Sequence, residues 1–146
     1  MQIEIKIDSL CTEPRIIIIT DKMTEEINHM LKKLSKDTPQ IIAGFKDDKF
    51  EMLKQEEVIH IYANSGKVFA VTENGRYVIR SRLYELEEQL DESKFVRISN
   101  SEIINLERVK NFDLSITGTI CVKLSNDTVT YVSRRYVTKI KKLLGI

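Results

Sequence analysis

Histidine, cysteine and tryptophan are scarce in this sequence, and their scarcity removes several classes of function. The chain of 146 residues has two histidines, two cysteines and no tryptophan. Neither His29 nor His60 has a cysteine or a carboxylate at the spacing that a metal site uses, and Cys11 and Cys121 are equally isolated. We therefore expect no metal site, and reduced, partly buried thiols rather than a disulfide.

Glycine is also rare, which bears on nucleotide-binding enzymes. The five glycines are scattered, and neither glycine-rich fingerprint of a phosphate-binding loop occurs. Acidic pairs such as Asp47-Asp48 are typical of solvated turns, and we find no nucleophile beside a candidate base. The sequence therefore predicts a protein that is not an enzyme, with no catalytic residue, no cofactor and no small-molecule substrate.

Long apolar runs are missing as well. No run reaches the length of a membrane-spanning helix, and the chain starts with an alternating pattern in place of a signal peptide, so we expect a cytoplasmic protein. Charge is unevenly spread: residues 1–57 hold nine basic and twelve acidic residues, a net charge of −3, whereas residues 58–146 hold 14 and 10, a net charge of +4. After Thr128 the charged residues are all basic, namely Arg134, Arg135, Lys139, Lys141 and Lys142. This cluster predicts either a phosphate-facing surface or a solvated helix face.

The first forty residues contain a short β-β-α pattern. Gln2–Asp8 alternates isoleucine with polar residues, and Arg15–Thr20 contains four consecutive isoleucines, so both are predicted to be strands. Thr24 is expected to cap a helix with the apolar stripe Ile27, Met30, Leu31 and Leu34. We interpret residues 1–40 as an extension that serves in dimerisation, binds a controlling partner, or completes the core.

From residue 41 onward the pattern is almost wholly β. Strands separated by charged turns are expected at 41–45, 49–53, 58–62, 67–72, 77–80, 108–114, 116–124 and 129–132. Asn74-Gly75 predicts a two-residue type I′ hairpin turn, and Ser81 and Ser133 are expected to cap two short helices. The predicted fold class is mainly β with small helices.

Two polar segments stand out among these strands, Lys94–Asn105 and Tyr131–Tyr136. Together they resemble the LytTR family of bacterial DNA-binding domains, over roughly residues 41–146. The residues at the positions of the family's two recognisable motifs are Phe95, Arg97, Asn100, Ser101, Asn105, Ser133 and Arg135. The resemblance implies short, mostly antiparallel sheets laid side by side. With only about forty residues ahead of it, we expect a stand-alone regulator without a receiver domain.

The same resemblance implies a sequence-specific, double-stranded DNA-binding transcription regulator whose loops enter the major groove. Family positions matching Asn100 and Arg135 make base contacts, and both side chains suit base edges. A third contact would come from the loop Asn64–Lys67, where Gly66 departs from the family's long polar residue. Either Lys67 or Asn64 replaces it, or this loop touches only phosphate.

Further residues are expected to contact phosphate or to support the contacts: Asn64, Arg97, Ser99, Ser101, Ser133, Arg134, Lys139 and Lys141. Structural alternatives stay open: Asn100 as a turn residue, Arg97 as an ion-pair partner, Asn105 as a backbone-bonding strand end. Promoter DNA is the expected partner; a homodimer on tandem repeats and a regulatory membrane protein are further candidates. The competing function is a protein-interaction or sensing module on the same fold that does not bind DNA.

Overall fold

The computed structural model describes residues 1–34 and 41–146, and the chain divides into two compact units. The first unit is Met1–Lys36 and the second is Asp37–Ile146.

The first unit contains one helix, α1 (Glu25–Leu34), in its described part. Thr24 caps it as predicted: the backbone N–H of Ile27 donates to Thr24 Oγ1 at 3.3 Å. Glu25 and Glu26 occupy the first turn, where the helix dipole favours acidic residues. The expected end of this helix, at residues 37–39, lies outside the described residues.

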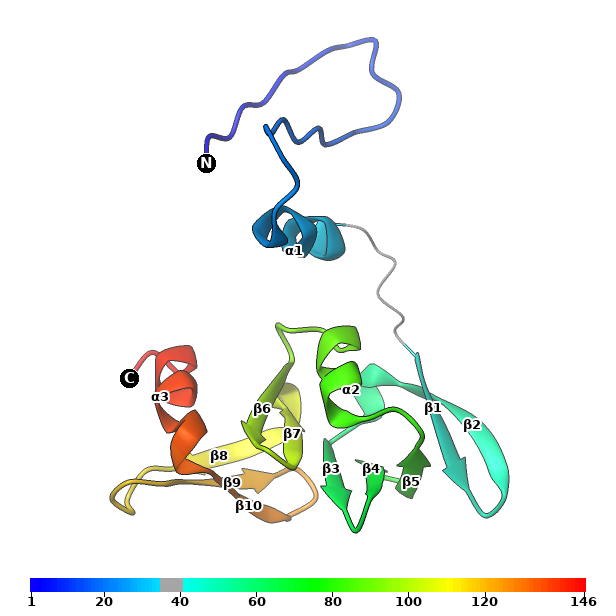
Figure 1. Ribbon diagram of the computed structural model, residues 1–146, viewed down its shortest axis with the longest axis vertical. Helices are drawn as coiled ribbons and strands as arrows, with labels where there is room; N and C mark the ends of the chain where they lie inside the picture. Colours follow the sequence, from blue (N-terminus) through cyan, green and yellow to red (C-terminus); the bar gives the residue numbers. More distant parts are fainter. Residues whose placement is uncertain (35–40) are drawn as a thin grey trace. The chain divides into compact units, whose positions relative to one another are not determined.

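The two strands predicted ahead of α1 do not form, so this prediction is wrong. Gln2–Asp8 and Arg15–Thr20 form no strand, and Figure 1 draws the whole stretch before α1 as coil. The alternation of apolar and polar residues gives a segment the propensity for a strand, but a strand exists only when a neighbour accepts its hydrogen bonds. Neither stretch has such a neighbour in the described part of its unit.

The second unit is built almost entirely of short strands. In chain order they are β1 (Ile41–Lys46), β2 (Lys49–Lys54), β3 (His60–Asn64), β4 (Lys67–Thr72), β5 (Gly75–Ile79), β6 (Phe95–Ser99), β7 (Glu102–Asn105), β8 (Val109–Asp113), β9 (Ile120–Leu124) and β10 (Val129–Val132). Its helices are η1 (Gln55–Glu57), α2 (Leu83–Gln89), η2 (Leu106–Arg108) and α3 (Arg134–Leu143).

These strands form two antiparallel sheets. One has seven strands in the order β2-β1-β5-β4-β3-β7-β6, and the other has three in the order β10-β9-β8. Figure 1 shows the two sheets side by side, with α2 over the larger sheet and α3 beside the smaller one. The predicted fold class, mainly β with short antiparallel sheets and small helices, is confirmed.

Two hydrophobic clusters hold the second unit together. In the first, Leu83, Leu86 and Leu90 of the α2 segment pack on the seven-stranded sheet against residues such as Ile61. The second joins β6 and β7 to the three-stranded sheet and to α3, whose Ile140 is fully buried. Because β6 and β7 contribute to both clusters, they connect the two sheets mechanically.

Several turns, helix caps and strand ends differ from the sequence predictions, among them β3, which begins at 60 and not at 58. Thr72 pairs with Gly75, so the β4–β5 turn consists of Glu73 and Asn74, and only Gly75 has a positive φ, at 122°. The predicted type I′ turn at Asn74-Gly75 is therefore wrong. The long strand expected at 116–124 is shorter, because β9 begins at 120. The cap position of α2 is Arg82 instead of Ser81.

Candidate nucleic-acid interface

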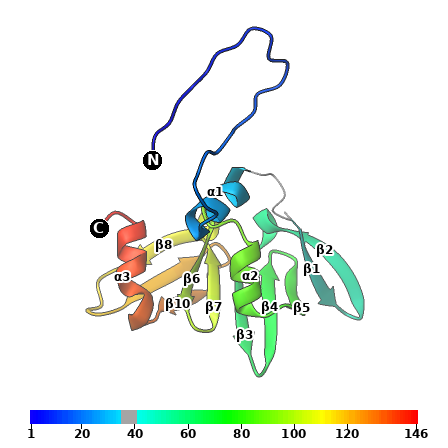
Figure 2. The same ribbon diagram turned by 45° about the horizontal axis from the view of Figure 1, so that its top comes forward.

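Three connections lie along one edge of the second unit: the β3–β4 turn, the β6–β7 turn and the start of α3. Figures 1 and 2 show all three on the lower side of the domain, although they come from distant parts of the sequence. Backbone hydrogen bonds hold them in place: Ala63 N–H donates to the Ser101 carbonyl at 2.8 Å, and Ser133 N–H donates to the Ile98 carbonyl at 2.9 Å. The fold thus gathers the two polar segments of the sequence at a single edge.

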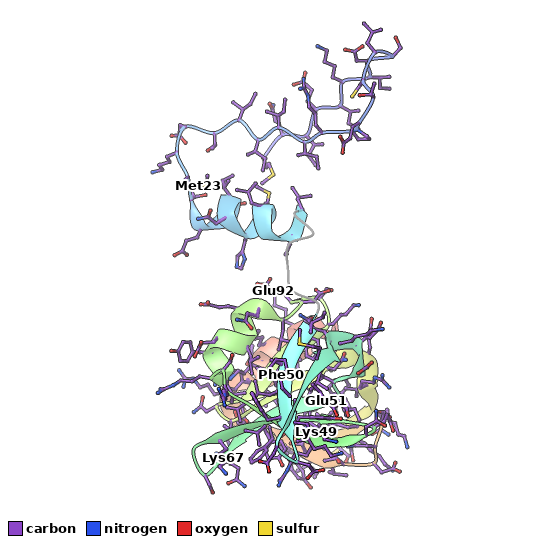
Figure 3. All side chains as sticks on the ribbon, turned by 90° about the vertical axis from the view of Figure 1, so that its right-hand side faces the viewer. Met23, Lys49, Phe50, Glu51, Lys67 and Glu92 are labelled. Atoms are coloured by element: carbon purple, nitrogen blue, oxygen red, sulfur yellow. The ribbon has the colours of Figure 1, made fainter. Side chains whose placement is uncertain are left out.

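The β3–β4 turn is a tight hairpin with an exposed tip. Asn64 pairs with Lys67, and the two residues between them, Ser65 and Gly66, have φ values of 52° and 77°. Two consecutive positive φ values define the type I′ geometry that suits a right-twisted hairpin. A Cβ built on Gly66 would meet nothing within 4 Å, so the tip is open. Figure 3 shows Lys67 at the free end of this hairpin.

The β6–β7 turn carries Asn100 at its exposed tip. A register shift between Arg97 and Ser99 makes β6 irregular just before the turn. Ser99 Oγ accepts a hydrogen bond from Ser101 N–H at 3.2 Å, and the Ser99 and Ser101 hydroxyls are 3.3 Å apart. The turn is therefore stabilised by its own serines, and the Asn100 side chain projects from it.

Arg97 holds this turn from the inside. Its Nε donates to the Ser99 carbonyl at 3.0 Å, and one Nη donates to the Asn100 carbonyl at 2.6 Å. The other Nη forms an ion pair with Glu87 of α2 at 2.7 Å. The side chain of Arg97 is 16% exposed, so its guanidinium is committed to the protein. The structure thus places Arg97 as an ion-pair partner and a support for the turn.

Tyr136 connects this turn to α3. Its hydroxyl donates to Asn100 Oδ1 at 3.3 Å, across 36 positions of the chain. Tyr136 is not among the site residues predicted from the sequence. The tyrosine is partly covered by the second hydrophobic cluster, and a partly buried tyrosine hydroxyl usually has a hydrogen-bond partner. That general preference was the available signal, but the sequence does not indicate which partner.

The first turn of α3 presents two free arginines. Arg134 and Arg135 are exposed, and neither guanidinium has a hydrogen bond or ion pair with any described residue. No acidic residue stands in the first turn of α3, so the positive end of the helix dipole adds to their field. Ser133 occupies the N-cap position, but its side chain makes no capping bond.

The lysines of α3 lie farther from the edge. Lys139, Lys141 and Lys142 are all exposed. In Figure 1 the helix rises from the lower edge, and a helix advances about 1.5 Å per residue, so Lys141 stands about 10 Å beyond Arg134. At about 100° per residue, helical spacing places Arg135 and Lys142 on the face roughly opposite Ile140, with Lys139 and Lys141 on the two flanks and Arg134 beside Lys141. A polyanion at the edge would meet the arginines first.

Asn105 has a structural place, as its alternative interpretation predicted. It is fully buried; its Nδ2 donates to the Val58 carbonyl at 2.8 Å, and its Oδ1 accepts from Glu107 N–H at 3.0 Å. Phe95 of the same motif is also buried. These two motif residues stabilise the fold.

Beyond the β3–β4 hairpin, this side of the unit carries acidic as well as basic side chains, because Lys46 and Lys49 flank the β1–β2 turn. The next hairpin along the same side in Figure 1, between β1 and β2, turns at Asp47 and Asp48, both exposed.

Within the described ranges, no helix is long and apolar enough to cross a membrane, and no three metal-ligating side chains gather. Cys11 and Cys121 are free thiols, the first of them exposed rather than partly buried.

The fold and this edge define a class: a β-rich domain whose polar turns and basic helix start face one side. The LytTr DNA-binding domain family model matches residues 48–145, and the chain belongs to this family. A solved LytTr DNA-binding domain from Bacillus cereus, described as part of a methyl-accepting/DNA response regulator, superimposes with a TM-score of 0.71 at 22% identity. The superposition covers 73% of this chain and 98% of the solved chain.

Relatives are similar over the whole length of the chain. "Uncharacterized HTH-type transcriptional regulators" of Staphylococcus aureus strains MSSA476 and MW2 are each 32% identical over 147 residues, covering 100% of this chain and 99% of theirs. Within residues 41–146, five strands separate α2 from α3, so these two helices do not form a helix-turn-helix pair. The similarity also includes the first unit, which the family model does not reach.

Proposed function

We propose that this protein is a sequence-specific, double-stranded DNA-binding transcription regulator that reads the major groove with the edge described above. The observation that carries the proposal is that two side chains lie at the same edge: Asn100, which accepts a hydrogen bond from Tyr136, and Arg135, which has no partner among the described residues. Membership of a DNA-binding family and the names of the full-length relatives support it. Such a regulator would work in the cytoplasm, where promoter DNA is.

Base readout is assigned to Asn100, Arg135 and Lys67. Arginine can pair with guanine O6 and N7, and asparagine with adenine N6 and N7. Because Asn100 Oδ1 already accepts one hydrogen bond from Tyr136, its Nδ2 and the second lone pair of Oδ1 remain for a base. At the β3–β4 turn Gly66 has no side chain, so Lys67 is the group that reaches outward, to a base or to phosphate.

Phosphate contacts are assigned to the remaining polar residues of the edge. Asn64, Ser101 and Ser133 stand on the three connections, Arg134 lies beside Arg135, and Lys139 and Lys141 follow along α3. Such contacts fix the register of a protein on DNA without reading sequence. Ser99 and Arg97 are proposed to act indirectly, by shaping the turn that carries Asn100.

The test is a fluorescence anisotropy titration of the full chain against duplex DNA from upstream of its own gene. A scrambled duplex is the control, and both are measured at several salt concentrations. We expect a preference for the native duplex. Arg135→Ala should weaken binding to it by about 1–3 kcal/mol without changing the melting temperature. Arg82→Ala removes an equal charge from an exposed position, the N-cap of α2, and should change little.

Two results would contradict the proposal. Equal binding to both duplexes with a steep salt dependence would leave a nonspecific basic surface. Absence of binding at low salt would rule out the DNA-binding function and favour a protein-interaction module on the same fold. The further proposal of a regulatory membrane protein as partner would then be tested first.

A further inference from the structure

The first unit has strand-forming sequence but no sheet. Ile3, Ile5 and Ile7 alternate with polar residues, and they are 88%, 83% and 93% exposed. Neither Gln2–Asp8 nor Arg15–Thr20 forms a ladder in the structure. Three isoleucines on one side of an extended segment are an apolar stripe that no described residue of this unit covers.

The rest of the unit also leaves apolar side chains exposed. In the isoleucine run that follows, Ile16, Ile17 and Ile19 are exposed, and the stripe of α1 leaves Leu31 and Leu34 about half exposed. A unit of the size of Met1–Lys36 falls below the roughly 40 residues at which a domain usually needs disulfides, metals or oligomerisation to hold a core. Its described part offers neither a disulfide nor a metal cluster. Of these three means, oligomerisation is the one left.

The order of residues in Gln2–Asp8 fits a second copy of itself. If two such segments run antiparallel around Ile5, Glu4 of each faces Lys6 of the other, and Ile3 faces Ile7. Cross-strand pairs of opposite charge and of β-branched residues are the pairs that stabilise a sheet. A two-fold axis requires this kind of self-complementarity, in which residue i meets residue j and residue j meets residue i.

We propose that the first unit is a homodimerisation element, in which the Gln2–Asp8 segments of two copies pair antiparallel around Ile5. The pairing places six isoleucines on one face of a two-stranded ribbon. Such a ribbon alone is marginal in water, so the Ile16–Ile19 run and the α1 stripe of both copies cover that face. The inference goes beyond the proposed DNA contacts, because the dimer forms without DNA.

The first test reverses the charges of the pair, using sedimentation equilibrium of the full chain without DNA. We expect a dimer for the natural sequence. Glu4→Lys puts two lysines opposite each other at both symmetric positions and should raise the dimer Kd about tenfold. Lys6→Glu should do the same with two glutamates. The double variant Glu4→Lys/Lys6→Glu restores both pairs and should restore the natural Kd.

A matched control distinguishes the pair from general charge effects. Glu13→Lys makes the same change in net charge outside Gln2–Asp8 and should leave the Kd within a factor of about two. A monomer at all concentrations would overturn the proposal. So would a dimer whose Kd does not respond to Glu4→Lys, or a double variant no tighter than the single ones.

A second test reads the register directly and does not depend on charge. In a Cys11→Ser background, Ile5→Cys brings two cysteines to directly opposite positions, about 5 Å apart between Cα atoms, which a disulfide can bridge. Ile3→Cys in the same background separates the two cysteines by about 14 Å along the ribbon. Oxidation should link the Ile5→Cys chains and leave the Ile3→Cys chains unlinked. Equal linking of both would overturn the register.

Discussion

The β6–β7 turn and the start of α3 carry similar residues but use them in opposite ways. The Arg97 guanidinium donates to two carbonyls and forms an ion pair with Glu87, whereas Arg135 has no partner among the described residues. Both were expected to contact DNA, from the same family resemblance. The difference shows that a motif can combine residues that shape a surface with residues that the fold leaves available for a ligand, and that only the contacts in the fold separate the two kinds.

Removing Arg97 should have the largest effect of the changes that test this contrast. Arg97→Ala leaves two carbonyls and a carboxylate without their charged donor, so we expect a loss of about 1–3 kcal/mol in the free energy of unfolding. Preference for the native duplex should fall as well, because the Asn100 turn loses its support. Urea denaturation and anisotropy titrations measure the two effects.

Glu87→Gln sharpens this prediction. It breaks the ion pair with Arg97 but leaves the carbonyl bonds of Arg97 intact, so its effect on both quantities should be smaller. If Arg97→Ala weakened DNA binding while the protein kept its full stability, Arg97 would be a direct contact and the contrast with Arg135 would fail.

Tyr136→Phe should have an intermediate effect, limited to specificity. The change removes one oxygen atom and with it the hydrogen bond to Asn100, while the ring stays packed. We expect a loss of about 0.5–1.5 kcal/mol in the preference for the native over the scrambled duplex. Tyr131→Phe is the control, since that exposed hydroxyl makes no hydrogen bond with a described residue. An equal loss in both variants would argue against a positioning role for Tyr136.

Lys141→Ala should have the smallest effect. Because Lys141 stands far along α3 from the edge, it can at most reach phosphate, so binding to both duplexes should weaken by a similar, few-fold factor. The slope of log K against log salt should fall by about 0.9 if the contact exists. Lys54→Ala is the control, because this exposed lysine pairs with Ile41 at the end of β2 opposite the β1–β2 turn. A selective loss on the native duplex would show that α3 lies closer to the bases than proposed.

The sequence predicted local structure well where flanking turns limited a strand. The expected strands at 67–72 and 129–132 agree with β4 and β10, and α3 follows directly after Ser133 as expected. It could not predict the strand order of the larger sheet, because that order depends on contacts between distant segments. The strands expected before α1 show the same limit: periodicity reports which face of a segment is apolar, and it does not report whether a partner exists.

The candidate site was predictable as a set of residues but not as a set of roles. Asn100 and Arg135 follow from the motif, and the structure brings both to one edge. The commitment of Arg97 to Glu87 depends on how α2 lies against β6, and the bond from Tyr136 depends on how α3 packs beside β6. Neither arrangement has a sequence signature, since each joins residues ten or more positions apart.

The open tip of the β3–β4 turn has a consequence for how this protein could change its target. A residue other than glycine at position 66 would be strained by a φ of 77°, although space around it is free. Substitutions at the two residues that flank the tip, Asn64 and Lys67, avoid this backbone strain. Both positions tolerate any side chain that suits an exposed strand end. Variants of this chain that recognise other promoters should therefore differ at Asn64 and Lys67 while keeping Gly66.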